Sequence, residues 1–425
     1  MEKQYDLLIY GATGSVGKKV AEYLYRNARP GLKWAIAGRS QGKLEQIVEG
    51  LKGSVEGGEP VDVGIVVGSG ETIDNVAKAA KVVMTTVGPY EVLGEPLVKA
   101  CIEHNADYLD INGEPQFMVR MIEKYGKLAK TNNVTLIPTC GFDSVPSDLG
   151  TLFLVEEAKR NFKCGVSEVT SVFTKFDGTA GSGSVASIVK LFAEPSSLDP
   201  YGLQKDYPNP EPEKVTEYFP DWHYQPEYIP ELGMYGIPFM LGYANTRVVR
   251  RSASIFASAT PTESVKLNGS DAYCSGRFLY KEFSGIQSKV GAYTLCGILT
   301  GILNTAQKLL ANKTLNEKVF NLITNMGFKP DDKAIERGSA RVVQIAKTDE
   351  AEPRTLFTEI NTLDPGFGET SRILAEAGML LALEKQSIPA HSLVGGFYTP
   401  ATALGTRLLD KLNEKADWIK RIDSP

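Results

Sequence analysis

Three glycines, Gly11, Gly14 and Gly17, form the part of the sequence whose spacing is best suited to binding a ligand. A strand-forming apolar run, 5–10, leads directly into them, and a helix-like segment, 18–26, follows. In this context the first glycine permits a tight turn, the second lets backbone N–H groups approach a pyrophosphate, and the third lets helix and strand pack closely. The phosphates would then lie at the positive end of the helix. An ordinary strand–helix turn is the simpler alternative.

The end of the second predicted strand, 32–37, indicates which dinucleotide would bind. NAD sites usually carry an acidic residue there, which accepts hydrogen bonds from the ribose hydroxyls and repels a 2′-phosphate. Here Arg39 and Ser40 occupy that place, and Lys43 follows a helical turn later. Because a guanidinium fork and a hydroxyl suit a phosphate dianion, the sequence favours NADP(H) over NAD(H). The alternative is that Arg39 is a solvated surface cation.

Glycine-containing segments also follow later predicted strands, where ligands on a parallel sheet bind. Residues 88–90 would pass the nicotinamide ribose, and 140–143 would lie at the nicotinamide itself, with Gly141 permitting close backbone approach and Phe142 walling the ring. The residues predicted to bind the cofactor are Gly11, Thr13, Gly14, Ser15, Val16, Arg39, Ser40, Lys43, Val87, Gly88, Pro89, Cys140, Gly141 and Phe142.

Two residues in these segments are candidates for catalysis. Tyr90 could hydrogen-bond the cofactor or donate a proton to the substrate, although a packed aromatic side chain in a turn is the favoured alternative for the second role. Asp143 is either a carboxylate near the reacting centre or the cap of a helix that begins near 145–146. Glu114, which precedes Pro115, has the same two interpretations.

Arg247, Arg250 and Arg251 form a basic cluster that could hold a carboxylate, a phosphate or a coenzyme A tail of the substrate. A solvated face or an interdomain ion pair is the alternative.

The elements that position these residues predict an α/β fold, a Rossmann doubly wound parallel sheet joined to an α+β substrate domain with a mixed sheet. Strands and helices alternate up to residue 138, which is the pattern of such a sheet. Segment 247–256 is expected to be a strand leading into a helix or more strand, and 339–347 and 355–363 an antiparallel pair. The expected domains are 1–145 (NADP-binding), 146–365 (substrate, with a lid-like loop 196–236 and an apolar helix 286–311), and 366–425 (C-terminal helices packing back on the Rossmann domain).

Composition excludes several classes of protein. The 425 residues are 42% hydrophobic and 23% charged with a net charge of −5, so a folded protein of two or three domains is expected, without nucleic acid as a partner. The five cysteines form no CxxC pair and, with three distant histidines, no plausible metal site. Because the first strand begins almost at Met1, we expect no signal or transit peptide and a cytoplasmic location.

The uncharged segment 290–307, between Lys289 and Lys308, barely reaches the length of a membrane-spanning helix, and its Thr, Gly, Asn and Gln dilute its hydrophobicity. A buried helix or a hydrophobic surface helix is therefore expected, and contact with a membrane or lipid droplet stays open. A homodimer is also left open.

Together the motifs resemble those of the saccharopine dehydrogenase-like oxidoreductases, in particular the branch that contains trans-acting enoyl reductases. The likeness runs from the first strand to the last helix and is carried by GATGSVG, AGRS, VGPY, NGEPQFM, CGFDSVPSDLG, NTRVVRRSAS, GFGETSRILAEA and GGFYTPATALG.

The resemblance implies NADP(H)-dependent enoyl or carbonyl reduction of an acyl or other lipid-like substrate. Saccharopine itself is disfavoured because the basic residues that bind amino-acid carboxylates in saccharopine-forming enzymes have no match here. Two alternatives remain: an amino-acid or imine oxidoreductase of saccharopine type, and a non-catalytic lipid-surface protein that retains a cofactor pocket.

Overall fold

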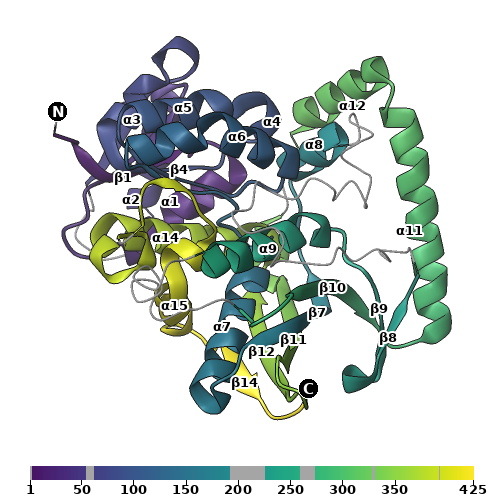
Figure 1. Ribbon diagram of the computed structural model, residues 1–425. Helices are drawn as coiled ribbons and strands as arrows, with labels where there is room; N and C mark the ends of the chain where they lie inside the picture. The colour runs from purple at the N-terminus through teal and green to yellow at the C-terminus, as the bar shows by residue number, and fades with distance from the viewer. Residues whose placement is uncertain (1, 54–61, 192–224, 259–272, 328–330, 392) are drawn as a thin grey trace.

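A computed structural model describes residues 2–53, 62–191, 225–258, 273–327, 331–391 and 393–425 of the chain. Within these residues the strands form two seven-stranded sheets, here called sheet A and sheet B. Figure 1 shows sheet A and its helices in purple and blue at the upper left, with sheet B below and to the right.

Sheet A has the order β13-β6-β5-β4-β1-β2-β3, and every strand pairing in it is parallel. This order confirms the predicted doubly wound sheet. The chain runs outward from β1 to β3 and then returns to place β4 on the other side of β1, so the carboxyl ends of the central strands meet at one edge. Its strands are β1 (Tyr5–Tyr10), β2 (Trp34–Gly38), β3 (Val63–Val67), β4 (Ala80–Thr85), β5 (Asp107–Asp110), β6 (Thr135–Ile137) and β13 (Gly396–Phe397).

Sheet B has the order β14-β12-β11-β7-β10-β9-β8 and is mixed, since β7 and β10 pair in parallel and the other neighbours antiparallel. The predicted antiparallel pair is confirmed as β11 and β12. Its strands are β7 (Val166–Asp177), β8 (Glu227–Ile229), β9 (Met234–Pro238), β10 (Leu279–Ile286), β11 (Ser339–Thr348), β12 (Thr355–Leu363) and β14 (Ile419–Ile422).

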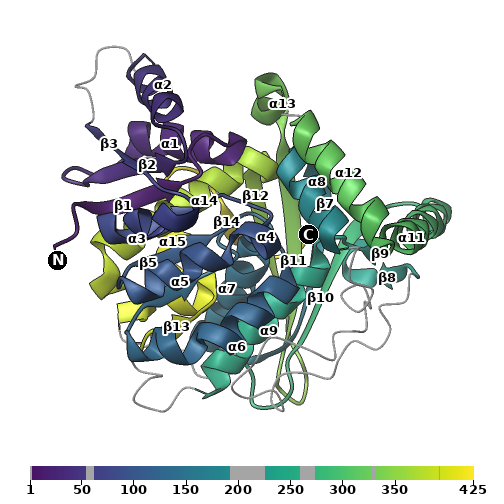
Figure 2. The same ribbon diagram turned by 90° about the horizontal axis from the view of Figure 1, so that it is seen from above.

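The helices cover both sheets and fill the space between them (Figures 1 and 2). Periodicity explains most of them: α6 begins with a proline in its first turn and buries Phe117, Met121 and Tyr125 at helical spacing. The helices are α1 (Ser15–Asn27), α2 (Gln41–Lys52), α3 (Asp74–Ala79), α4 (Tyr90–Leu93), α5 (Glu95–Glu103), α6 (Pro115–Thr131), α7 (Val145–Phe162), α8 (Ser182–Leu191), α9 (Gly242–Ser258), α11 (Lys289–Leu310), α12 (Lys313–Met326), α13 (Asp332–Arg337), α14 (Thr370–Leu383) and α15 (Pro400–Asn413).

Two predictions about the middle of the chain were wrong. Segment 247–256 belongs entirely to helix α9, which packs against α7 and β10, so tertiary packing overrides the strand expected from the local sequence. The predicted loop 196–236 contains β8 and part of β9, and its residues 196–224 lie outside the described part of the chain.

The C-terminal segment contacts both sheets, so 366–425 is not simply an addition to sheet A. Helix α14 packs on α1, β1 and β4, and at Gly378 it approaches so closely that an added Cβ would lie 2.3 Å from Met84 Sδ. Strand β13 extends sheet A beside β6, and β14 closes the edge of sheet B beside β12. The predicted domain limits stay a prediction.

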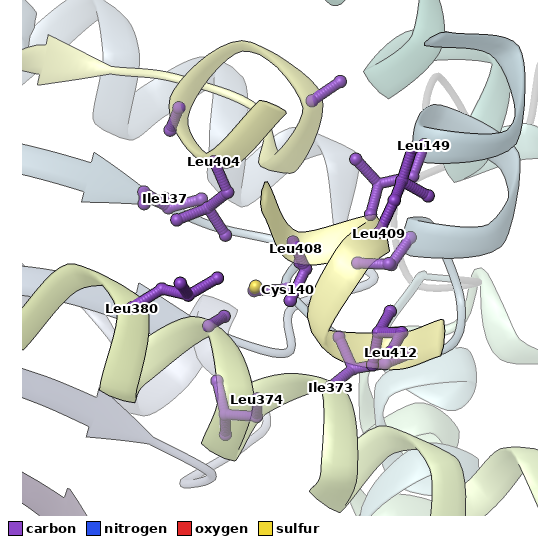
Figure 3. Close-up of a cluster of buried hydrophobic side chains, with 14 of the residues drawn as sticks. Ile137, Cys140, Leu149, Ile373, Leu374, Leu380, Leu404, Leu408, Leu409 and Leu412 are labelled. Carbon is purple, nitrogen blue, oxygen red and sulfur yellow. The ribbon is translucent and has the colours of Figure 1, made fainter. Parts of the chain in front are cut away.

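One hydrophobic cluster continues from sheet A through α14 and α15 to α7 and sheet B. Figure 3 shows its centre, where leucines of α14 and α15 surround Cys140 and face Leu149 of α7. Packing of this density makes the loss of a single side chain costly.

Leu380→Ala should lower the free energy of unfolding by about 2–5 kcal/mol, because the Leu380 side chain is 0% exposed and its removal leaves a cavity. Leu383→Ala on the same helix is the matched control, since Leu383 is 39% exposed and should cost less than about 1 kcal/mol. Urea unfolding followed by circular dichroism measures both, and equal losses would contradict the packing described.

Candidate cofactor and substrate site

The predicted glycine turn joins β1 to α1 and has no room for other residues at two positions. Gly11 has φ 95°, and an added Cβ would lie 2.6 Å from Val87 Cγ2. At Gly17 an added Cβ would lie 2.3 Å from the Gly11 carbonyl oxygen, so glycine alone lets the helix approach the turn. A Cβ added to Gly14 would lie 3.2 Å from the same oxygen, so this position is tight but less restricted.

The start of α1 suits the pyrophosphate of a dinucleotide. Gly14 is the N-cap, no side chain caps the helix, and the first turn carries no acidic residue. Thr13 and Gly14 are exposed, and Ser15 and Val16 are half-buried. The free N–H groups and the positive end of the helix therefore face a space that a phosphate can enter.

The predicted 2′-phosphate site lies at the end of β2. Arg39 is exposed and, among the described residues, forms no ion pair or hydrogen bond that would occupy its guanidinium. Ser40 is the N-cap of α2, but its hydroxyl makes no capping hydrogen bond. Lys43 is exposed in the first turn of α2. These three groups are thus available to an anion, as predicted for NADP(H), although their contact with it stays a prediction.

Tyr90 is buried, and its hydroxyl is already used within the protein. It donates a hydrogen bond of 3.0 Å to the Thr85 carbonyl oxygen and accepts one of 3.3 Å from the Ile111 amide. Burial and the Asp110 carboxylate raise the pKa of Tyr90 well above its usual value. This geometry supports the packed-aromatic alternative, and no contact supports the prediction that Tyr90 donates a proton.

Glu114 has a structural role. Its carboxylate accepts hydrogen bonds from the Tyr90 amide at 3.0 Å and the Glu91 amide at 2.8 Å, which are the first amides of α4. It also accepts one of 2.7 Å from the Ser187 hydroxyl of α8. Glu114 therefore holds 87–90 in place and ties α8, the helix that follows β7 of sheet B, to the carboxyl edge of sheet A.

Residues 140–142 follow β6 and lie mainly in the core. The Cys140 side chain is fully buried among leucines (Figure 3), and burial raises the pKa of its thiol, so only its backbone could contact a cofactor. Gly141 fits between Ile111 and Thr370, where an added Cβ would lie 3.2 and 3.3 Å from their methyl groups. Val87 and Gly88 are half-buried, and Pro89 and Phe142 are buried.

Asp143 differs from its neighbours because its carboxyl is not used for structure. The N-cap of α7 is Ser144, with no side-chain capping bond, so Asp143 does not cap the helix. Among the described residues Asp143 forms no hydrogen bond or ion pair. Its Oδ2 lies over Gly113, where an added Cβ would be 2.9 Å away, and burial raises its pKa to about 6.

A buried polar network lies behind Asp143 and fixes its position. Ser144 donates to Asn245 Oδ1 of α9 at 3.1 Å, and Asn245 donates to Glu282 Oε1 of β10 at 2.7 Å. Glu282 also accepts hydrogen bonds from Ser147 and Tyr280, at 2.8 and 2.6 Å. Burial raises the pKa of Glu282 to about 7, with the Asp143 charge contributing. Sequence patterns did not indicate this network, because its members are far apart in the chain.

An aromatic cluster joins Phe142, the residue before Asp143, to sheet B. Phe142 lies 6.3 Å from Phe173 and 6.1 Å from Phe176, both on β7, and Phe239 stacks on Phe173 at 4.0 Å (ring centroids). Three of the rings are buried, but Phe176 is 47% exposed. The exposed Phe176 ring lies next to Phe142, which precedes Asp143 in the chain, so this region combines an apolar ring with an unpaired carboxyl, as suits an apolar ligand with one polar group.

The segment that leads into α14 contacts both the Phe142 loop and the loop after β7. Sequence analysis did not include this segment in the site. Thr370 accepts a hydrogen bond of 3.2 Å from the Phe142 amide. Asp364, fully buried, accepts hydrogen bonds from the Phe367 amide at 2.7 Å and from Thr179 at 2.8 and 2.9 Å. The motif GFGETSR could have indicated this role, since it places several small and polar residues at a helix start.

The three predicted substrate arginines lie within α9 and are all buried. Arg247 stacks on Tyr243 and donates to its carbonyl oxygen at 2.7 Å, and Arg251 donates to the Phe397 carbonyl oxygen at 2.7 Å. The alternative that these arginines form a solvated face is therefore wrong. A substrate role for Arg247, Arg250 and Arg251 stays a prediction without an exposed side chain to support it.

Within the described residues, no group of three or more His, Cys, Asp or Glu side chains could hold a metal ion. In the same part of the chain, no helix has both the length and the hydrophobicity that crossing a membrane requires.

The sheet order, the glycine turn and the basic edge define a dinucleotide-binding domain. Residues 7–137 match the family model described as "Saccharopine dehydrogenase NADP binding domain". The chain belongs to the saccharopine dehydrogenase-like oxidoreductases and is an NADP(H)-dependent oxidoreductase.

Relatives match over nearly the whole chain. The trans-acting enoyl reductase of Mycobacterium ulcerans is 30% identical, with 97% of this chain and 96% of the relative covered. The human saccharopine dehydrogenase-like oxidoreductase is 28% identical with the same coverage. Among solved structures, apo saccharopine dehydrogenase (L-Glu forming) from Saccharomyces cerevisiae has a TM-score of 0.50 at 13% identity, covering 98% of this chain and 99% of that chain, which shows a shared fold.

Arg39→Ala should weaken NADPH binding about 10- to 100-fold, because a charge-assisted hydrogen-bond pair to the 2′-phosphate contributes about 1.5–3 kcal/mol. NADH affinity should change less than about twofold, since NADH lacks that phosphate. Arg26→Ala, an exposed arginine in the last turn of α1, is the matched control. Fluorescence titration of the wild type and both variants with each nucleotide measures the six affinities. If NADPH and NADH affinities fall together, the assignment of Arg39 is wrong.

Proposed function

We propose that the protein is an NADPH-dependent reductase of an acyl or other lipid-like substrate that carries an enoyl or carbonyl group. The observation that carries this proposal is the unpaired Asp143 carboxyl at the carboxyl edge of the dinucleotide-binding sheet, directly after Phe142 of the aromatic cluster. The names of the trans-acting enoyl reductases in the family point to the same substrate class. When bound, NADPH supplies the hydride that such a reduction requires.

In this proposal the residues of the turn, Gly11–Val16, bind the pyrophosphate, and Arg39, Ser40 and Lys43 bind the 2′-phosphate. Residues 87–89 and 140–142 bind the nicotinamide end through backbone groups and the Phe142 ring. The steric limits at Gly11, Gly17 and Gly141 come from neighbouring protein atoms, and this tight packing fixes the backbone that would bind the cofactor.

Asp143 donates the proton. Its carboxyl keeps a proton to higher pH than an exposed aspartate because burial disfavours the charged form, with a pKa of about 6. The Ser144–Asn245–Glu282 chain of hydrogen bonds holds the start of α7, and thereby Asp143, in position. Tyr90 remains the second candidate from the sequence, but its hydroxyl is bonded to Thr85.

The aromatic cluster binds the apolar part of the substrate. Phe176 offers an exposed ring next to Phe142, and Phe239 and Phe173 support it from behind. A lipid-like substrate is concentrated in membranes and lipid droplets, and a peripheral lipid contact through 290–307 would bring the enzyme to it.

The alternative of an amino-acid or imine oxidoreductase would need cationic side chains to hold a carboxylate. The arginines of α9 predicted for that role are buried, and Arg247 and Arg251 donate hydrogen bonds to backbone carbonyl oxygens. For this reason the acyl substrate is preferred.

Purified protein with NADPH and a panel of enoyl and carbonyl acyl thioesters tests the proposal, with amino-acid-derived imines as the comparison. We expect oxidation of NADPH, followed by absorbance, with at least one thioester. Turnover of imines alone would favour the alternative, and no turnover with any member would contradict the proposed reaction.

Asp143→Asn should lower kcat at least about 100-fold, because the amide cannot donate a proton as an acid does. In the wild type, activity should fall as pH rises through about 6, since Asp143 loses its proton there, and this limb should vanish in the variant. NADPH affinity should stay unchanged. Glu156→Gln, another acidic residue of the α7 segment, is the control. An unaltered pH profile in Asp143→Asn would contradict the role.

Phe176→Ala should raise KM for a long-chain thioester about tenfold, because it removes an exposed ring that the apolar chain covers. KM for a short-chain thioester should change little, since that chain does not reach the ring. Tyr228→Ala removes another exposed ring, on β8, and serves as the control. Equal effects on both substrates would place the acyl chain elsewhere.

A further inference from the structure

Helix α11 (Lys289–Leu310) is exposed over most of its surface although its sequence is apolar. It stands at the outer edge of the molecule (Figure 1) and packs one face, through Ala292 and Cys296, on β9 and β10 of sheet B. Of its 22 residues only Ala292 and Cys296 are buried. Five of its large apolar residues are at least half exposed, and Ile302 is 58% exposed. They are Val290, Tyr293, Ile298, Ile302 and Leu309.

This exposure is unusual for a water-facing helix. Soluble proteins rarely leave a continuous apolar patch of this length uncovered, because each exposed large side chain forgoes about 1.5–3 kcal/mol of burial. At 1.5 Å per residue the helix is about 33 Å long, so the patch extends across much of one side of the protein.

The apolar residues are spread widely around the helix. With 3.6 residues per turn, the arc from Tyr293 through Val290 and Ile298 to Leu295 covers about 200°. A single partner helix packs against a stripe of about 100°. A convex surface this wide is better covered by a deformable phase than by one rigid partner.

The groove on this face is shallow and apolar. Gly297, Gly301 and Thr305 lie along one row at four-residue spacing, with Ile298, Ile302 and Leu309 beside them, and together with Ala306 they line the groove. No heavy atom lies within 4 Å of the position of a Cβ added to Gly297 or Gly301. The two glycines therefore contact no neighbouring element within the described protein.

The charges of the chain segment that contains α11 and α12 are mostly of one sign. Residues 289–327 contain four lysines, at 289, 308, 313 and 318, and one acidic residue, Glu317, which gives a net charge of +3 in a chain whose total is −5. Lysines that border an apolar surface can extend their ammonium groups toward anionic headgroups while their methylenes stay among the acyl chains.

We propose that α11, with the exposed residues Leu315, Leu322 and Met326 of α12, docks on an anionic lipid surface and inserts its apolar arc among the acyl chains. The helix lies in the plane of the interface and does not cross it, in agreement with its length and polar content. The width of the apolar arc and the cationic border favour lipid over a second copy of this chain. The proposal does not depend on the reductase chemistry.

Cosedimentation with vesicles tests the docking. Wild-type protein should bind phosphatidylcholine vesicles that contain about a third phosphatidylserine, and should bind pure phosphatidylcholine vesicles about tenfold or more weakly. Ile298→Ser with Ile302→Ser should weaken binding to the anionic vesicles at least about tenfold. Both side chains are exposed, so folding is unaffected, and circular dichroism verifies this.

Val394→Ser is the matched control, because Val394 is an equally exposed aliphatic residue outside the patch, and binding should not change. Lys308→Gln should lower binding to anionic vesicles about fivefold and leave the weak binding to neutral vesicles unchanged. The variant Ile302→Trp in the presence of brominated lipid should lose fluorescence, which reports insertion directly.

Two outcomes would overturn the proposal. One is wild-type protein that does not sediment with anionic vesicles, together with an Ile302→Trp variant whose fluorescence brominated lipid does not quench. The other is a stable dimer in solution that Ile298→Ser with Ile302→Ser converts to monomer without any vesicle binding, in which case a second copy covers α11. NADPH oxidation measured in the same variants, without lipid, should equal that of the wild type, so this test is separate from the test of the reaction.

Discussion

The contact between Gly17 and the Gly11 carbonyl oxygen determines the geometry of the nucleotide end of the site. Because no side chain separates α1 from the turn, the helix begins directly beyond β1, and its first amides face the same space as the ends of β2 and β4. A larger residue at either position would force the helix away from the turn. The exposed Arg39 edge is useful for binding only because this turn fixes where a dinucleotide would lie.

A second buried interaction joins motifs that are distant in the chain. Asp148, in CGFDSVPSDLG, accepts hydrogen bonds from Ser252 of α9 and from the Ala401 amide at the start of α15. Ser252 also bonds Thr399, in the C-terminal motif. Burial raises the pKa of Asp148 to about 7, and its hydrogen bonds order three helices around one carboxyl group. The distinctive motifs thus build the framework behind the site, and few of their residues face a ligand.

Sequence patterns predicted sheet A well, because strands and helices in a parallel sheet alternate and the glycine turn has strict steric requirements. They also predicted the pair β11–β12. For α11 they left a buried helix and a hydrophobic surface helix open, and the structure shows a surface helix. They failed at α9, where β-branched residues favoured a strand and packing on α7 decided otherwise. Local patterns could not predict that Glu114 caps α4, that Asp143 caps nothing, or that Asn245 and Glu282 stand behind it. The last of these depends on contacts between residues more than a hundred positions apart.

The position of β13 has a consequence for synthesis of the chain. Strand β6 ends at Ile137, but its neighbour on the outer edge, β13, consists of Gly396 and Phe397. A ribosome that adds about 5–20 residues per second needs on the order of tens of seconds to produce the intervening segment. During that interval the nascent sheet has an unprotected border that can pair with other chains, which is the kind of surface that ribosome-associated chaperones shield.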